Sequence, residues 1–111
     1  MENTRRFERF PTQREGQYFL VKGNGRGQEC TIIDVSRKGL GMIFHSNEEI
    51  KIGTTLRLEI PDPITIDTID VRGELRWSKE IGGEFIGGIE LNRILSDVKF
   101  SKLAKAHTGY K

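Results

Sequence analysis

The hydrophobic pattern of this chain is mainly that of β-strands. In residues 69–78 apolar and charged positions alternate strictly. The apolar or small positions are Ile69, Val71, Gly73, Leu75 and Trp77. Because successive side chains of a strand point to opposite faces, this alternation predicts a strand with one buried face.

Further short apolar segments predict a barrel of strands. The strand-like segments besides 69–78 are 17–22, 29–35, 40–44, 54–60 and 84–91. Asn24-Gly25 and Gly82-Gly83 suit tight hairpin turns, and the prolines at 61 and 63 end the strand before them. Six short strands with hairpin-length connections favour an all-β, antiparallel closed barrel, since closure removes the exposed edges.

The C-terminal region has helical periodicity instead. Ser96 is a suitable N-cap, and the apolar positions at helical spacing are Val98, Phe100, Leu103, Ala104 and His107. We expect this helix to lie against the barrel wall or to close one end. The expected organisation is therefore an N-terminal segment over 1–16, a barrel over 17–92, and a helix with a tail over 93–111.

Composition limits the classes of function. At 111 residues the chain is one domain, and 18 Lys and Arg face 16 Asp and Glu. So small an excess does not favour bulk binding to nucleic acid or anionic membranes, so any anion site must be local. The single cysteine, Cys30, allows no internal disulfide, and no apolar run approaches membrane-spanning length. We expect a cytoplasmic protein without direct membrane insertion.

Catalysis is disfavoured by the chemistry that the sequence offers. The two histidines, His45 and His107, are far apart, and neither has a partner at metal-ligand spacing. Cys30 has no nucleophile context and suits a small buried hydrophobe in a strand. We therefore expect neither an enzyme nor a metal site.

An arginine motif stands near the N-terminus. Arg5 and Arg9 form Arg-x-x-x-Arg, interleaved with Phe7 and followed by Phe10 and Pro11. A solvated basic tail is the simpler interpretation, but the aromatic residues suit a segment held on a protein surface. A guanidinium can bind a phosphate or the O6/N7 edge of guanine through two parallel bonds.

A second polar motif, Asp34-x-Ser36-x-x-Gly39, lies between two apolar strands. Taken alone it favours a turn, in which Asp and Ser bond to backbone amides and Gly39 supplies a positive φ angle. A carboxylate at a strand end can also accept the N1–H and exocyclic amine of guanine. Together, the two motifs offer complementary groups for one guanine nucleotide.

With these motifs in this order, the sequence resembles the PilZ domain family. The segments "RGELRW" and "GGIEL" are also similar to strands of that family. The resemblance implies a six-stranded antiparallel barrel with a C-terminal helix, and a receptor for the bacterial second messenger cyclic di-GMP. It implies that Arg5 and Arg9 bind guanine and phosphate, that Arg6 assists, and that Asp34, Ser36 and Gly39 form the opposite wall.

The resemblance extends to two further positions. Thr4 precedes the arginine motif where an arginine favours an intercalated pair of ligands, which implies a single ligand here. Trp77 could floor the site, although a position in the core or at the barrel rim is the favoured expectation.

The resulting hypothesis is an adaptor switched by its ligand. Residues before Gln17 are expected to be mobile until the ligand draws Arg5 and Arg9 onto the barrel beside Asp34. The partner would then be a protein of motility, exopolysaccharide or secretion machinery.

Two alternatives stay open besides an enzyme. One is a PilZ-like interaction module that binds no nucleotide. The other is a β-barrel for single-stranded nucleic acid, which requires several exposed aromatic side chains. The aromatic residues of the strands, Tyr18, Phe19, Phe44, Trp77 and Phe85, are expected mostly in the core, which disfavours the second alternative.

Overall fold

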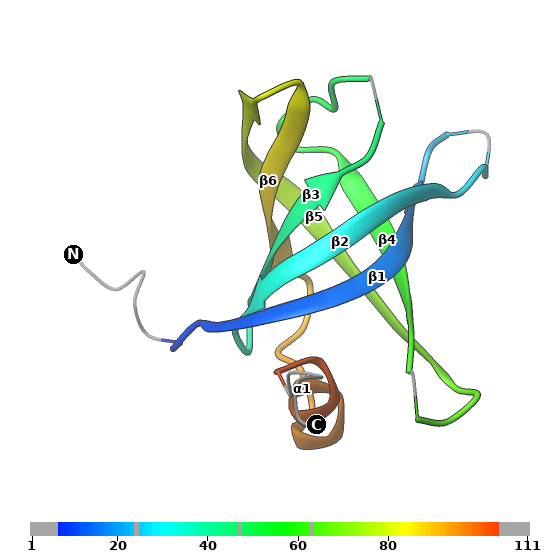
Figure 1. The fold of residues 1–111 in the computed structure, drawn as a ribbon, viewed down its shortest axis with the longest axis vertical. Coiled ribbons are helices and arrows are strands. Elements are labelled where there is room, and N and C mark those ends of the chain that lie inside the picture. The colour runs from blue at the N-terminus through cyan, green and yellow to red at the C-terminus, as the bar shows by residue number, and fades with distance from the viewer. Residues whose placement is uncertain (1–6, 24, 47, 63, 105–111) are drawn as a thin grey trace.

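The computed structural model describes residues 7–23, 25–46, 48–62 and 64–104. Its elements are β1 (Phe10–Leu20), β2 (Gln28–Val35), β3 (Gly39–Phe44), β4 (Thr55–Pro61), β5 (Thr68–Ile81), β6 (Glu84–Leu91) and α1 (Asp97–Ala104). The strands form a closed antiparallel barrel in the order β1-β2-β3-β6-β5-β4, and α1 lies at one end (Figure 1). The predicted fold class, a six-stranded antiparallel barrel with a C-terminal helix, is confirmed.

The first strand closes the barrel. β1 pairs with β2 from Phe10 to Tyr18, and its last residues, Gln17 to Leu20, also pair with β4. Each described strand therefore has a partner on both sides. Residues 10–16 of β1 pair with β2 alone and residues 76–81 of β5 pair with β6 alone, so closure removes edge strands but not every strand edge.

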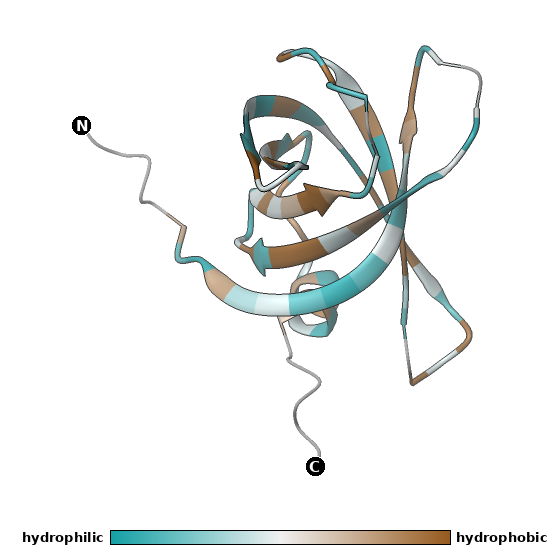
Figure 2. Cartoon of the chain, turned by 45° about the horizontal axis from the view of Figure 1, so that its top comes forward, coloured by the Kyte–Doolittle hydropathy of each residue, from teal (hydrophilic) through white to brown (hydrophobic). Residues whose placement is uncertain are grey.

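The core follows the alternation seen in the sequence. Ile69, Val71, Gly73 and Leu75 of β5 are buried, while Asp70, Arg72 and Glu74 are exposed or partly exposed. Figure 2 shows brown and teal segments alternating along the strands. The largest fully enclosed side chains, all less than 2% exposed, include Ile32, Leu40, Met42, Phe44, Leu56, Leu58 and Leu103. Burial of such apolar surface is the main term stabilising the barrel.

The beginning of β1 corrects the expected boundary at Gln17. The strand starts at Phe10, so residues 10–16 belong to the barrel. Thr12 Oγ1 donates to the carbonyl oxygen of Leu103 at 2.8 Å, and Arg14 Nη2 donates to that of Lys102. Polar side chains that bond helix carbonyls replace the apolar alternation here, which is why hydropathy misses this half of β1 (mostly teal and white in Figure 2).

The helix begins as the sequence predicts. Ser96 Oγ accepts the backbone N–H of Lys99 at 3.2 Å, which is the expected N-cap bond. Leu103 is fully buried, and the Phe100 ring meets the Phe10 ring edge-on at 5.6 Å between centroids. His107 lies outside the described residues. No helix within the described ranges is long and apolar enough to cross a membrane.

The β5–β6 hairpin confirms its predicted turn. Gly82 and Gly83 have φ angles of 59° and 86°, which glycine adopts without the steric cost that a side chain would bring. Gly25, in the β1–β2 connection, likewise has a φ of 80°. Asn24, the other residue of that predicted turn, lies outside the described residues.

Candidate functional site

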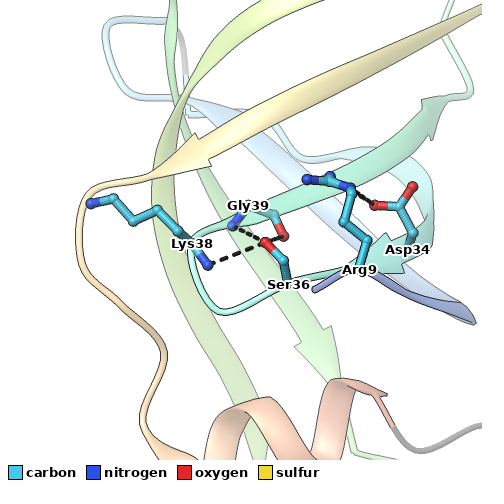
Figure 3. Close-up of polar contacts among 5 residues, drawn as sticks. All are labelled: Arg9, Asp34, Ser36, Lys38 and Gly39. Atoms are coloured by element: carbon cyan, nitrogen blue, oxygen red, sulfur yellow. Dashed lines mark hydrogen bonds and ion pairs between the residues drawn. The ribbon is translucent and has the colours of Figure 1, made fainter. Parts of the chain in front are cut away.

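The turn between β2 and β3 is organised by Ser36. Its side chain is buried, and Oγ accepts the backbone N–H groups of Lys38 at 3.3 Å and Gly39 at 3.0 Å (Figure 3). The Ser36 N–H donates to the carbonyl of Gly39 at 2.8 Å. These bonds fix the loop without any other group, so the turn interpretation of this motif holds.

Gly39 serves this turn differently from the expectation. It is not among the described glycines with a positive φ angle, so conformational freedom does not explain it. A Cβ at this position would lie 3.0 Å from the Ile89 carbonyl oxygen and 3.6 Å from both Arg9 Nη1 and Ser36 Oγ. Gly39 therefore allows β6 and Arg9 to approach the turn closely.

Arg9 and Asp34 are brought together across β1 and β2. Arg9 Nη2 and Nε donate to Asp34 Oδ1 at 2.8 and 3.2 Å (Figure 3). The two side chains keep 51% and 33% of their exposure, so the pair is accessible to solvent. Both bonds end on Oδ1, which leaves Oδ2 unused by Arg9. Arg9 and Asp34, one from each sequence motif, thus contact each other directly.

An open groove of about 360 Å³ lies beside this pair. Arg9, Ser36, Lys38 and Gly39 line one side of it. The remaining lining residues are Phe7 and a stretch of β5 and β6, namely Arg76, Trp77, Gly88, Ile89 and Glu90. Residues from both sequence motifs therefore face one space.

Trp77 lies in the wall of this groove and not in the core. Its side chain is 49% exposed. The β5–β6 register shifts between Leu75 and Trp77, so two residues of β5 oppose one of β6. Such a bulge turns the following side chain to the other face, which breaks the inward alternation that the sequence suggested.

A glycine makes room for the indole. A Cβ at Gly88 would lie 2.1 Å from Trp77 Nε1, so only a glycine at this position lets the ring lie against the backbone of β6. The exposed part of the indole then forms a flat apolar surface in the groove.

Charged side chains complete the far wall. Arg76 Nε bonds to Glu90 Oε1 at 3.0 Å, and its Nη1 lies 3.6 Å from Glu74 Oε2. Lys38 reaches away from Arg9, and its Nζ donates to the Asn92 carbonyl at 3.4 Å (Figure 3). The groove therefore has guanidinium groups on two sides and an ammonium stem beside the turn, an arrangement suited to anions.

Sequence reasoning missed Gly41, which faces Asp34 across the β2–β3 pair. A Cβ at Gly41 would lie 2.6 Å from Asp34 Oδ2, so the carboxylate occupies the space that a side chain would take. The signal in the sequence was a second glycine, two residues after Gly39, inside an apolar strand where glycine is unfavourable.

Four of the six expected site residues are brought together: Arg9, Asp34, Ser36 and Gly39. Arg5 and Arg6 lie outside the described residues. Across the described part of the chain, no group of three or more His, Cys, Asp and Glu side chains is placed to hold a metal ion.

Comparison with known proteins agrees with this fold. The PilZ domain family model matches residues 3–104. A similar solved structure is that of the Bacillus subtilis inhibitor of motility MotI/DgrA, with a TM-score of 0.66 and 16% identity. The match covers 92% of this chain and 49% of that one, so this chain spans about half the length of that protein. No curated protein matches the sequence.

Proposed function

Because the chain belongs to the PilZ domain family, we propose that it is a receptor for cyclic di-GMP and acts as an adaptor on a protein partner. The observation that carries this proposal is the single groove that Arg9 shares with Ser36, Gly39 and Trp77. The side chains that line this groove suit a cyclic dinucleotide, which has two negative charges and two flat guanine bases.

Each side of the groove has a distinct task in this proposal. Arg9 binds a phosphate or the O6/N7 edge of guanine through its planar fork. Asp34 accepts the N1–H and amino group of guanine, a pairing that few other acceptors satisfy as well. The Ser36 turn and Gly39 let a ligand approach the backbone beside Arg9, and the exposed indole of Trp77 offers a stacking surface to a base.

The segment before β1 contributes the remaining cations. Arg5 and Arg6 precede Arg9 by a few residues, and we propose that they close over the ligand once it is seated. The switch then concerns residues before Phe10 only, because β1 already belongs to the barrel. Its free energy must come from contacts that exist only in the closed state.

The cellular role follows from the same premise. A receptor domain of this size acts by presenting a changed surface to another protein. The similar structure is named an inhibitor of motility, which makes motility machinery one candidate target beside exopolysaccharide and secretion systems. We place the protein in the cytoplasm, where cyclic di-GMP is made.

Titration calorimetry with cyclic di-GMP tests the proposal. We expect saturable heat at protein concentrations of about 50 µM, and none from GTP or a short oligonucleotide. Arg9→Ala and Asp34→Ala should each weaken binding by at least about tenfold. Arg72→Ala, which removes an exposed arginine outside the groove, is the matched control and should bind like the wild type.

Other results would identify a different function. Absence of heat with cyclic di-GMP favours an interaction module that binds no nucleotide. Oligonucleotide binding that weakens steeply with salt favours a nucleic-acid barrel. Wild-type affinity in Arg9→Ala rejects the assigned site even if the ligand binds.

A further inference from the structure

A second groove, of about 540 Å³, lies between α1 and the β5–β6 pair. Its floor contains aliphatic side chains that are at least nine-tenths buried, Val71, Leu91 and Leu95. Arg72, Arg93 and Lys99 stand around it, and no acidic residue lines it. We call it the β5–β6–α1 groove. It shares no lining residue with the groove beside Arg9.

Among the arginines that the structure describes, the two at the β5–β6–α1 groove lack an ion-pair or hydrogen-bond partner for their side chains. Within the described part of the chain, neither Arg72 nor Arg93 forms an ion pair or a side-chain hydrogen bond. The remaining described arginines each have an interaction of their own: Arg9, Arg14, Arg26, Arg37, Arg57 and Arg76. The two unpaired guanidinium groups thus meet in one place.

The surroundings of Arg72 explain why it stays unpaired. Arg57 faces it across the β4–β5 pair and itself contacts the carboxylates of Glu59 and Asp70. Lys99 Nζ, on the helix side, donates to the backbone carbonyl of Asp70 at 3.1 Å and has no carboxylate partner in the described structure. The charge around the groove is therefore not neutralised from within.

An apolar floor beneath unpaired cations fits one kind of occupant. We propose that the β5–β6–α1 groove binds an acidic segment of a partner protein, with a branched aliphatic side chain on the floor and carboxylates on Arg72 and Arg93. Bidentate arginine–carboxylate bonds supply orientation, and the buried aliphatic anchor supplies affinity. Ile94, 57% exposed at the rim, extends the apolar contact.

Other occupants fit less well. A nucleic acid needs aromatic surfaces for stacking, and this groove is lined by none. A strand-addition partner would need the edge of β5 before Gly73, which β6 does not cover. There the Asn92 N–H and Lys99 Nζ already donate to the carbonyls of Arg72 and Asp70. The chain's own residues 105–111 contain two lysines, one histidine and no acidic side chain, so their charge does not complement the groove.

Backbone amide NMR on the full chain tests this proposal. The probe is a mixture of short peptides randomised among Asp, Glu, Leu, Ile and Val. We expect shifts at Leu91–Ser96 and at 71–72, with little change at 36–39. The double variant Arg72→Glu/Arg93→Glu should weaken binding by at least about tenfold. The double variant Lys51→Glu/Lys79→Glu, an equal reversal of two exposed charges outside the groove, is the control and should retain most of it.

Three outcomes would overturn the assignment. One is the absence of shifts at Leu91–Ser96 with the acidic mixture. Another is equal loss of binding in Lys51→Glu/Lys79→Glu and in Arg72→Glu/Arg93→Glu, which would indicate nonspecific charge attraction. The third is stronger shifts at these residues with oligo-dT or phosphatidylglycerol vesicles than with peptide. Thermal unfolding of each variant confirms that the barrel is intact. The titration is made without cyclic di-GMP, so the two proposals can fail separately.

Discussion

At the scale of single residues, the position of Asp34 depends on the missing side chain at Gly41. We expect Gly41→Ala to turn the carboxylate away from Arg9, because the end of a side chain moves at lower cost than a strand. Cyclic di-GMP affinity in calorimetry should fall about tenfold, while the free energy of unfolding changes by less than about 1 kcal/mol. Wild-type affinity in this variant would mean that the ligand does not use Asp34.

Ser36 is expected to matter for stability even without a ligand. Ser36→Ala removes the acceptor for two backbone N–H groups beside a buried side chain. The free energy of unfolding in urea should fall by about 1–2 kcal/mol. Ser101→Ala is the control, since Ser101 lies exposed on α1 and its side chain forms no hydrogen bond in the described structure. Equal losses in both variants would contradict the structural role of Ser36.

We expect the buried thiol of Cys30 to lower the free energy of unfolding at alkaline pH. Burial first, and the nearby charge of Glu15 second, raise the pKa of its thiol from 9.0 to about 12. The unfolded chain releases this proton at lower pH than the folded one, so the stabilisation present below pH 9 is lost as pH rises toward 12. Between pH 7 and 10 the thiol should lower the free energy of unfolding by roughly 1 kcal/mol.

Urea unfolding of the wild type and Cys30→Ala at both pH values measures this difference. The variant should show a smaller decrease from pH 7 to pH 10. Parallel decreases would mean that Cys30 does not contribute to the pH dependence.

At the scale of elements, hydropathy predicted those strands whose buried face is apolar. β5 alternates strictly as far as Leu75, and the helix start at Ser96 follows from its capping side chain. The first half of β1 was missed because its inward positions bond helix carbonyls. For the same reason the site was only half predictable: local motifs located Asp34 and Ser36, whereas the bulge that exposes Trp77 depends on register between strands.

Phe100 lies where α1, β1 and the turn between β2 and β3 meet. Its ring contacts Phe10 of β1, and the Arg37 guanidinium lies 4.6 Å from its centroid while bonding to Asp97 at 2.7 Å. We expect Phe100→Ala to increase hydrogen exchange in α1 and in the first residues of β1 together, because both lose a shared contact. The β4–β5 pair serves as the internal control, and increased exchange there as well would indicate a general loss of stability.

At the scale of the whole molecule, the two grooves share a connection. The Leu91 N–H donates to the Lys38 carbonyl at 2.7 Å, and the Leu95 N–H donates to that of Arg37 at 2.8 Å. The wall of the β5–β6–α1 groove is therefore bonded to the turn that contains Ser36. A ligand that rigidifies this turn also orders the wall on which a partner segment would lie.

This connection predicts reciprocal binding. Saturating cyclic di-GMP should tighten acidic peptide binding by about fivefold or more, and the peptide should tighten cyclic di-GMP by the same factor. Calorimetric titration of each in the presence of the other measures both. Unchanged affinities would show that the grooves act independently, and unequal factors would show that a further species takes part.

The contact between Arg9 and Asp34 has a consequence for sensitivity. If the ligand recruits either group, it competes with the protein's own cation for the carboxylate. An exposed pair of this kind is worth about 0.2–1 kcal/mol, so it raises the concentration for half-saturation by no more than about fivefold. Substitutions that strengthen or weaken the pair would therefore adjust the response threshold of the receptor while leaving its chemical selectivity unchanged.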